Sequence, residues 1–506
     1  MTVQTPSAGE TLSAILDHDQ SAPAVIVPDD GQVISYGQLA DHVARLAGCL
    51  ASAGAQRGDR VAFTLPNGPD VIQLMLAITA LGAAAAPLNP TYTTSEYEFY
   101  LSDIQPRLLL MPDSRPAAAT AAAGSLPVLG VRPGTAGLPA LIANKSMVTQ
   151  ASVLEDAQPG DAALILHTSG TTSRPKQVSL TQRNLMASTR TIASFYQLEP
   201  ADASFCVMPL FHVHGLVAST FAALAAGGTV IVPRRFTPRG FWPQAREHGA
   251  SWLSAGPTLH QMILERADAA GAPGTLRFAR SCSSALAPAL LERAEATYGV
   301  PVLEAYGMTE ASHQISSNPL PPGERVPGSV GVATGTQIAI ADGAGNSLDP
   351  GEVGEVVVRG PGVMSGYADN ADATAEAFTE DGWFRTGDRG VLRNGYLYLA
   401  GRLKEMILRG GENIAPAEIE QALLAHPAVR DAVCFGIPDD KYGELVGAAV
   451  TVTEEVPPRD LAEHCRGRLA GFKVPARIYL LEEIPRTATG KIQRRRVADV
   501  VLDSKP

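Results

Sequence analysis

A polar run at residues 168–178, T-S-G-T-T-S-R-P-K-Q-V, follows an apolar stretch that is typical of a buried strand. Small hydroxyl residues and a glycine let backbone N–H groups close around phosphate oxygens, and Lys176 adds a positive charge. Because no G-K-[ST] sequence opens the following helix, the run is not a Walker A loop. A plain polar turn between a strand and a helix is the alternative. The length and order of the run favour a phosphate-binding loop.

Five more runs follow along the chain: M-P-L-F-H at 208–212, Y-G-M-T-E at 306–310, F-R-T-G-D at 384–388, G-R-L-K-E at 401–405 and P-R-T-A-T-G-K-I at 485–492. Together with the first run they resemble the motifs of the acyl-adenylate-forming enzymes, which include acyl-CoA synthetases, luciferases and peptide-synthetase adenylation domains. The resemblance covers nearly the whole chain. It implies that a carboxylic acid is joined to the α-phosphate of ATP and then passed to coenzyme A.

Adenylation brings two anions together, so fixed cations and N–H groups aimed at the developing charge supply the largest catalytic effect. The resemblance places Lys491 between the carboxylate and the α-phosphate, and Thr309 on the α-phosphate. It makes Glu310 the ligand of Mg²⁺, for which a carboxylate is a suitable hard oxygen donor. His212 is expected to shape the acyl pocket and completes the predicted catalytic set. Without the resemblance, Lys491 would be interpreted as a surface lysine.

The resemblance also implies an ATP site. Asp388 and Arg402 are expected to hold the ribose hydroxyls, as an acidic residue does in dinucleotide folds. Small side chains at 283–285 are expected to leave room for the adenine ring. The residues assigned to ATP are Thr168, Ser169, Gly170, Thr171, Thr172, Lys176, Ser283, Ser284, Ala285, Glu304, Ala305, Tyr306, Gly307, Met308, Thr309, Asp388, Arg402 and Lys491.

In relatives, a small C-terminal domain rotates about the position that Lys404 occupies here. We therefore expect an N-terminal domain at 1–402 with a β-rich subdomain at about 330–400, a hinge at 403–405 and a mobile C-terminal domain at 406–506. After the rotation, Gly410 and Gly411 are expected to approach the pantetheine arm of coenzyme A, where glycine permits close contact.

Three longer stretches at 208–216, 280–288 and 302–321 resemble those of oxalyl-CoA synthetases, a branch of this family. Oxalate keeps a second carboxylate that needs compact hydrogen-bond donors, whereas a long-chain acid needs an apolar tunnel. We expect His214, His313 and Ser283 to supply these donors, although each histidine taken alone also fits a partly buried structural role. Malonate or another short acid is the alternative substrate.

The first run departs from the family pattern at two positions, Ser173 and Gln177, where glycine is common. The Gln177 side chain is expected either to intrude near the phosphates or to point to solvent. This departure motivates a different class of hypothesis, a nucleotide-binding pseudoenzyme.

The elements that must position these residues follow from the apolar pattern. Buried strands are predicted at 60–65, 107–111, 162–167, 229–232 and 277–281, and helices at 70–81, 181–195, 257–266 and 287–298. This alternation predicts an α/β fold with doubly wound sheets, in which ligands gather at the carboxyl ends of parallel strands. Short β runs follow from residue 336, and a small α+β section follows residue 401.

Composition excludes several classes. The chain has 506 residues, 40 basic and 51 acidic, with a net charge of −11, so neither nucleic acid nor an anionic membrane is an expected partner. The 45% hydrophobic content suits a large globular core. Five cysteines, an odd number without paired spacing, suggest neither a disulfide framework nor a zinc site. No basic residue precedes Arg45, so we expect no secretory signal and a cytoplasmic protein.

Overall fold

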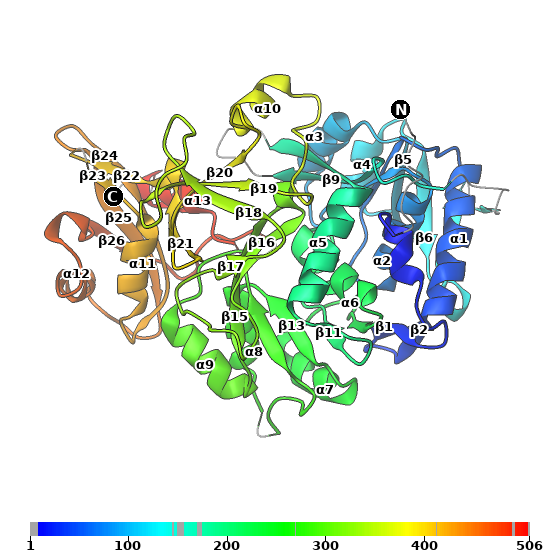
Figure 1. The fold of residues 1–506 in the computed structure, drawn as a ribbon, viewed down its shortest axis with the longest axis horizontal. Coiled ribbons are helices and arrows are strands. Elements are labelled where there is room, and N and C mark those ends of the chain that lie inside the picture. The colour runs from blue at the N-terminus through cyan, green and yellow to red at the C-terminus, as the bar shows by residue number, and fades with distance from the viewer. Residues whose placement is uncertain are drawn as a thin grey trace.

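The structure is a computed structural model that describes residues 9–143, 146–148, 156–168, 175–268, 270–410, 412–487 and 491–503. Within these ranges the strands form four sheets, and most helices pack on the faces of the two largest (Figure 1). The fold mixes helices and sheets in a large N-terminal part and a smaller C-terminal part, which confirms the predicted α/β class.

The first sheet carries Thr168 near one edge. Its order is β10-β9-β4-β3-β5-β6-β7-β8, and β3, β4, β5, β6 and β9 run parallel. The strands are β3 (Arg60–Phe63), β4 (Ala84–Pro87), β5 (Leu108–Pro112), β6 (Val128–Arg132), β7 (Ala140–Ala143), β8 (Ser146–Met147), β9 (Ala162–Thr168) and β10 (Lys176–Thr181). The accompanying helices are α1 (Tyr36–Ser52), α2 (Pro69–Ala80), α3 (Thr94–Ile104) and α4 (Ala117–Ala123).

One strand of this sheet, β10, was not predicted from the sequence. The polar run does not connect a strand directly to a helix, because β10 pairs antiparallel with β9 before the helix begins. The alternating Val178 and Leu180 are fully buried, which is the pattern of a strand with one face in the core. The run therefore joins two neighbouring strands of one sheet.

The second sheet has the order β17-β16-β15-β14-β13-β11-β12-β1-β2. Its strands are β1 (Pro23–Val27), β2 (Gln32–Ser35), β11 (Ala203–Phe205), β12 (Thr229–Ile231), β13 (Trp252–Ala255), β14 (Phe278–Ser281), β15 (Val302–Met308), β16 (His313–Ser317) and β17 (Val332–Ala333). The helical segments are η1 (Leu12–Leu16), α5 (Gln182–Phe195), α6 (Ala222–Ala225), α7 (Pro238–Glu247), α8 (Pro257–Leu264) and α9 (Pro288–Tyr298). Strands β11, β13, β14 and β15 run parallel, so their carboxyl ends meet at one edge.

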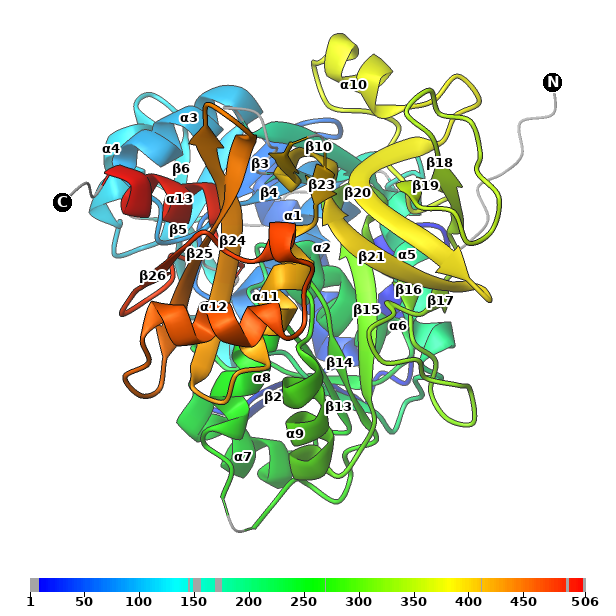
Figure 2. The ribbon, with the colours of Figure 1, turned by 90° about the vertical axis from the view of Figure 1, so that its left-hand side faces the viewer.

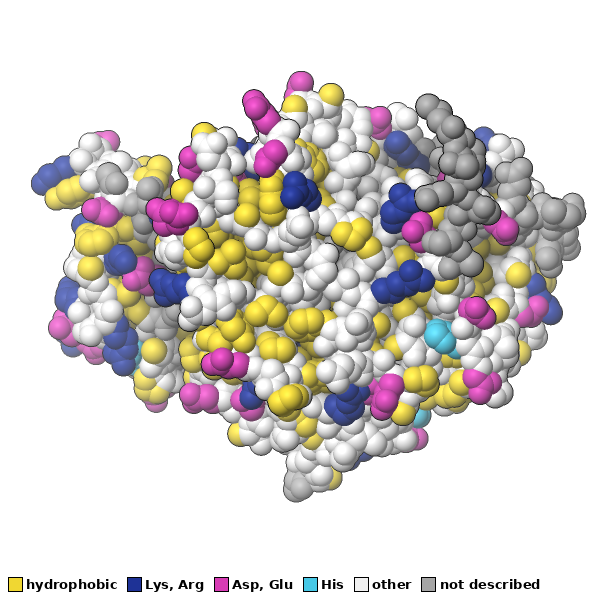
Figure 3. All heavy atoms as spheres, viewed as in Figure 1, with side chains coloured by type: hydrophobic (Ala, Val, Ile, Leu, Met, Phe, Trp, Pro, Cys, Tyr) yellow, Lys and Arg dark blue, Asp and Glu magenta, His cyan; other side chains and the backbone are white. Residues whose placement is uncertain are grey.

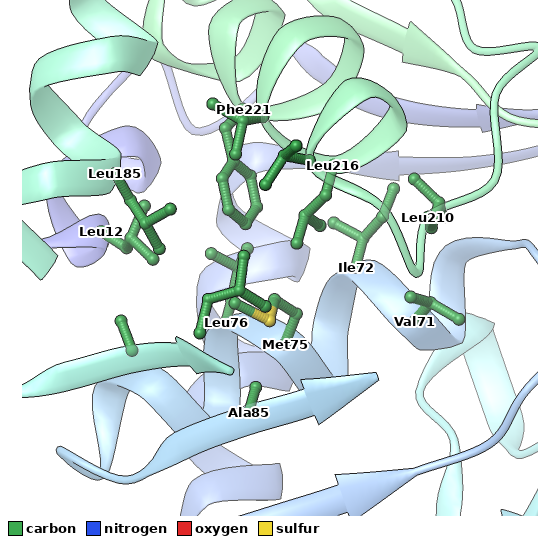
Figure 4. Close-up of a cluster of buried hydrophobic side chains, with 14 of the residues drawn as sticks. Leu12, Val71, Ile72, Met75, Leu76, Ala85, Leu185, Leu210, Leu216 and Phe221 are labelled. Carbon is green, nitrogen blue, oxygen red and sulfur yellow. The ribbon is translucent and has the colours of Figure 1, made fainter. Parts of the chain in front are cut away.

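The core between these two sheets is built around α2, which is buried on nearly every side (Figure 4). Its apolar side chains meet the first sheet, helix α5 and a π-helix, η3 (His214–Phe221). The cluster includes Val71, Ile72, Met75, Leu76, Ala85, Leu185, Leu216 and Phe221. π-Helical turns occur frequently at functional sites, and this packing fixes the turn that begins at His214.

The third sheet is antiparallel, with the order β18-β19-β20-β21. Its strands are β18 (Gln337–Ala341), β19 (Gly354–Arg359), β20 (Phe384–Arg393) and β21 (Tyr396–Arg402), and α10 (Ala371–Ala377) lies beside them. Asn394 and Gly395 connect β20 to β21 with φ angles of 50° and 82°, which suit a tight hairpin. The resulting register places Asp388 opposite Arg402.

The C-terminal part forms the fourth sheet, shown in Figure 2 with its helices. Its strands are β22 (Ile407–Arg409), β23 (Glu412–Ile414), β24 (Val429–Asp439), β25 (Gly443–Val452) and β26 (Arg477–Leu480). The helical segments are η5 (Leu403–Glu405), α11 (Pro416–Leu424), α12 (Pro458–Arg466), η6 (Gly471–Lys473) and α13 (Arg494–Asp503). Arg486 Nη1 donates to Thr258 Oγ1 on α8 at 2.8 Å, which joins this part to the second sheet. The predicted domain boundaries stay predictions.

On the face in Figure 3, basic and acidic side chains are interspersed rather than gathered by sign. Among the described residues, no helix combines the length and the apolar character that a membrane span requires.

Candidate active site

A cavity of about 520 Å³ lies where the sheets meet. Its wall contains residues from every motif that the sequence singled out, including Thr168, Lys176, His212, His214, Ser283, Gly307, Met308, Thr309, Glu310, His313, Arg402, Lys404 and Lys491. Segments more than 300 residues apart in the chain therefore face one space. Its volume suits a nucleotide or another small ligand.

One end of the cavity combines a cation, a phenol and a carboxylate. Lys176 Nζ lies 4.6 Å from the centre of the Tyr367 ring, and the Tyr367 hydroxyl donates to Glu310 Oε1 at 3.2 Å. Burial raises the pKa of Glu310, while hydrogen bonds from Tyr367 and Thr168 act in the opposite direction. Sequence reasoning did not single out Tyr367. Four other predicted loop residues, Ser169, Gly170, Thr171 and Thr172, lie outside the described residues.

Gln177 follows neither of the two expected courses. Its side chain is 6% exposed, so it does not point to solvent, and it is absent from the cavity wall. It lies instead over α3, where its amide nitrogen donates to Asp103 Oδ2 at 3.2 Å. The same carboxylate contacts His167 Nε2 at 2.6 Å. This structural role weakens the motive for the pseudoenzyme hypothesis.

Lys491 comes from the C-terminal part and lines the cavity together with Thr309 and Glu310, which lie in the short turn η4 (Thr309–Ala311). Its backbone N–H donates to Thr487 Oγ1 at 3.2 Å, and its carbonyl accepts from Thr487 N at 2.8 Å. Removal from bulk water and the nearby Arg402 lower the pKa of Lys491, whereas three neighbouring carboxylates raise it. The predicted catalytic lysine is thus held beside the predicted phosphate ligands.

The hairpin β20–β21 supplies a polar pair at another part of the site. The Tyr306 hydroxyl donates to Asp388 Oδ2, and Arg402 Nε lies 3.3 Å from Asp388 Oδ1. Arg402 and the neighbouring Gly387 line the cavity, whereas Asp388 lies just behind them. An oriented carboxylate next to an arginine suits recognition of ribose hydroxyls, and this role stays a prediction.

Four of the residues predicted to bind ATP do not reach the cavity. Ser284 and Ala285 are exposed, and Glu304 and Ala305 are buried in β15, so none of the four lines the cavity. Burial raises the pKa of Glu304 to about 7, and its carboxylate accepts from Gly328 N at 3.0 Å. The structure gives Glu304 a contact with the protein rather than with the cavity.

The three predicted acid-binding residues come together. His214 Nδ1 lies 2.9 Å from Ser283 Oγ, and the rings of His214 and His313 are 4.9 Å apart between centroids. Burial lowers the pKa of both histidines, and the positive charge of Arg280 lowers both further. Both rings are therefore neutral near pH 7. His212 also lines the cavity, and burial lowers its pKa to about 4.

Two of these residues adopt backbone conformations that are unusual for side chains with a Cβ. Ser283 has a φ of 78° and His313 a φ of 99°. Such conformations cost on the order of 1–3 kcal/mol each and persist where the surroundings enforce them. A Cβ atom at Gly307 would lie 1.8 Å from the His313 carbonyl oxygen, so glycine is required there. Two residues with strained backbone conformations therefore lie at the acid end of the cavity.

Sequence reasoning missed the layer behind this end. Ser254 Oγ lies 2.7 Å from His214 Nε2, and Arg280 Nη1 donates to the same oxygen at 2.8 Å. Ser254 and Arg280 are register partners on the parallel strands β13 and β14, so their side chains share one face of the sheet. The sequence did contain one indication of this layer, because Arg280 is a charged residue inside a strand that was predicted to be buried.

The predicted hinge and coenzyme A residues lie at the C-terminal border. Lys404, in η5, lines the cavity. Gly410 is not part of the wall, and its N–H donates to the Tyr442 carbonyl at 2.8 Å. Gly411 lies outside the described residues. The hinge and coenzyme A roles stay predictions.

Comparisons with known proteins support the fold. The chain belongs to the AMP-binding enzyme family, whose profile matches residues 14–368, and the AMP-binding enzyme C-terminal domain matches residues 418–491. This confirms the family resemblance.

Individual relatives match over nearly their whole length. The chain is 46% identical to an oxalate–CoA ligase from Arabidopsis thaliana over 490 residues, covering 93% of this chain and 94% of the relative. It is 39% identical to a sulfoacetate–CoA ligase from Cupriavidus necator, covering 97% of each. The crystal structure of ATP-bound MatB from Rhodopseudomonas palustris superposes with a TM-score of 0.88 at 30% identity, covering 98% of this chain and 99% of MatB.

Proposed function

We propose that the protein is an ATP-, Mg²⁺- and coenzyme A-dependent ligase that activates oxalate. In the first step an oxalate oxygen attacks the α-phosphorus of ATP and pyrophosphate leaves. In the second step the thiol of coenzyme A loses its proton and its sulfur attacks the acyl carbon; the bond from that carbon to the phosphate oxygen breaks, and AMP leaves with the electron pair on that oxygen. The observation that carries this proposal is one cavity that holds Lys491 and Thr309 together with a compact polar end made by His214, Ser283 and His313.

Lys491 and Thr309 supply the groups that the first step needs. The attack concentrates negative charge between the carboxylate and the α-phosphate, and a preoriented ammonium group stabilises such charge more strongly in a partly desolvated site than in water. Thr309 adds a hydroxyl donor on the same wall. Tyr367 contacts both Lys176 and Glu310, and this supports assigning Lys176 to the outer phosphates of ATP.

Glu310 fits the role of a magnesium ligand. Its carboxylate is 6% exposed and has no cation paired with it among the described residues, where burial alone would favour the neutral acid. No group of three His, Cys, Asp or Glu in the described ranges is arranged to hold a metal. Mg²⁺ is commonly held by one or two carboxylates plus substrate phosphates, so Glu310 and ATP together would provide its site. When bound, the ion would neutralise phosphate charge.

The acid end favours a short acid with a polar tail. Neutral imidazoles and a hydroxyl can donate hydrogen bonds to a second carboxylate, whereas an alkyl chain would leave these groups unpaired at a cost of about 1–3 kcal/mol each. The named activities of two relatives, on oxalate and on sulfoacetate, support an acid with two anionic groups. Oxalate is the proposal because the higher identity is to the oxalate enzyme.

The second step requires a change of the groups that face the acid. We propose that the C-terminal part turns about Lys404, withdraws Lys491 and brings Gly410 and Gly411 to the pantetheine arm. The position of Gly410 outside the cavity wall supports a role in a different arrangement from the one described.

A panel of acids tests the proposal. Pyrophosphate release would be measured with ATP, Mg²⁺ and oxalate, malonate, sulfoacetate, succinate or acetate, and acyl-CoA formation would be measured by chromatography. We expect the highest kcat/KM with oxalate. Preference for malonate or sulfoacetate would overturn the substrate, and no pyrophosphate with any acid would favour the pseudoenzyme.

A further inference from the structure

A buried cation without a carboxylate partner lies behind the acid end of the cavity. Arg280 is 0% exposed, and its Nε donates to the Tyr196 hydroxyl at 2.8 Å. Its Nη1 donates to Ser254 and lies 3.2 Å from His313 Nε2. Among the described residues, Nη2 has no nitrogen or oxygen partner, the Cys282 thiol interacts with the guanidinium, and no Asp or Glu pairs with it. A charge buried in this way is costly unless an anion compensates it.

The first consequence concerns His313. A guanidinium group has five N–H donors and no acceptor, so His313 Nε2 must accept from Arg280. The ring is neutral, and its one N–H is therefore at Nδ1. That atom lies beside Gly307, because a Cβ there would be 2.8 Å from it, and Gly307 lines the cavity. Arg280 thus leaves Nδ1 as the donor atom of His313, a residue that lines the cavity, and this N–H lies near the carbonyl oxygen of His313 itself.

The second consequence concerns Ser283, through two intermediate groups. Ser254 Oγ accepts from Arg280, so its own hydrogen is directed to His214 Nε2, 2.7 Å away. His214 then carries its proton on Nδ1 and donates to Ser283 Oγ at 2.9 Å. This leaves the hydroxyl hydrogen of Ser283 to be donated into the cavity that Ser283 lines.

We propose that Arg280 is a positioning residue that orients both relays so that the cavity presents donors to a second anionic group on the acid. This inference rests on the proposed function and names what selects its substrate class. An acid with a neutral tail gains less from these donors, because hydrogen bonds to a charged partner are about twice as strong as neutral ones.

The control residue is on the same stretch of chain. Arg277 lies just before β14 and pairs with Asp202, so its charge is compensated within the protein. An Arg277→Gln variant removes one arginine at the same sheet without touching either relay. This variant shows how much of a change in kcat/KM comes from reduced folding stability alone.

The experiment compares oxalate with oxamate, which carries an amide in place of one carboxylate. Arg280→Gln is expected to lower kcat/KM for oxalate by about 10- to 100-fold, with little change for oxamate or in the KM for ATP. Arg280→Lys, which restores a charge, is expected to recover part of the oxalate preference. Arg277→Gln should leave the oxalate-to-oxamate ratio unchanged. An unchanged ratio in folded Arg280→Gln would overturn the proposal.

A smaller change guards against misfolding. Ser254→Ala cuts the relay to Ser283 and keeps the contact of Arg280 with His313, so the ratio should fall by a smaller factor than in Arg280→Gln. If Ser254→Ala keeps the wild-type ratio, the relay through His214 is wrong. The acid panel with the wild-type protein tests the proposed function separately. If the preferred acid is malonate or sulfoacetate, the same variants are compared on that acid and on its analogue with one charge fewer, such as the monoamide.

Discussion

Removal of the Lys491 ammonium group separates the two half-reactions. Lys491 lines the cavity with Thr309 and Glu310 and is partly withdrawn from bulk water, which lowers its pKa. Two unit charges about 4 Å apart interact by about 4 kcal/mol at an effective dielectric constant of about 20. Such a loss corresponds to about a 10³-fold decrease in rate. Lys491→Ala should therefore reduce pyrophosphate release from ATP and oxalate by about 10³-fold.

The second half-reaction is expected to survive. Given presynthesised acyl-adenylate and coenzyme A, Lys491→Ala should still form the thioester at a substantial fraction of the wild-type rate, measured by chromatography. The fold should also persist, because the contacts of residue 491 with Thr487 use backbone N–H and carbonyl groups that alanine keeps.

Lys473→Ala is the matched control. Lys473 Nζ pairs with Glu418 at 2.7 Å in the C-terminal part, away from the cavity wall, and an exposed pair of this kind contributes about 0–1 kcal/mol. Both half-reactions should stay near wild type in this variant. Equal loss of both half-reactions in folded Lys491→Ala would refute the separation of steps, and no loss in either would make Lys491 a surface lysine.

Three further changes test other parts of the structure. His313→Ala should lower kcat/KM for oxalate by about 10- to 150-fold while the KM for ATP stays constant, because it removes a hydrogen bond to a charged group; unchanged oxalate kinetics would remove His313 from the site. Gln177→Gly should leave the kinetics with ATP unchanged. It should lower the free energy of unfolding, measured in urea, by about 1–3 kcal/mol, because a buried amide that is hydrogen-bonded to Asp103 is lost. Faster adenylation in this variant would show that the Gln177 side chain crowds the phosphates instead. Burial lowers the pKa of His260 from 6.5 to about 4. Between these two pH values the unfolded chain carries a proton on His260 that the folded protein does not carry. The free energy of unfolding therefore decreases as the pH falls through this range, by up to about 3 kcal/mol. His260→Gln should flatten this part of the pH dependence of urea unfolding, and an unchanged slope between about pH 7 and about pH 4 would show that His260 titrates normally.

Much of the fold follows from the apolar pattern because buried strands and amphipathic helices leave strong signals. The helix predicted at 181–195 is observed as Gln182–Phe195, and its start is fixed by Thr181, whose side chain accepts from Asn184 N. The strand β10 was missed because its six residues begin inside the polar run, where Lys176 and Gln177 interrupt the apolar pattern. The fate of Gln177 depends on Asp103, a residue 74 positions away, and no local pattern reports such a contact.

At the acid end, too, residues within motifs were predicted, whereas a residue whose role depends on strand pairing was not. Motif resemblance placed His214, Ser283 and His313 in one site, and the structure brings them together. Arg280 escaped notice because arginine is usually interpreted as a surface residue, and its importance depends on the register between β13 and β14. Pairing between strands that are distant in sequence is a property of the fold, so it becomes visible only when the sheet is built.

The uncompensated charge of Arg280 also bears on how stable the empty protein is. A guanidinium group buried without an anion makes the unliganded state less stable than a core of similar volume filled with apolar side chains would be. A bound acid would supply the negative charge that the buried guanidinium group lacks. Ligands that bind the native state stabilise it by an amount that grows with the logarithm of their concentration. We therefore expect the free energy of unfolding to rise with the concentration of the acid that the protein binds.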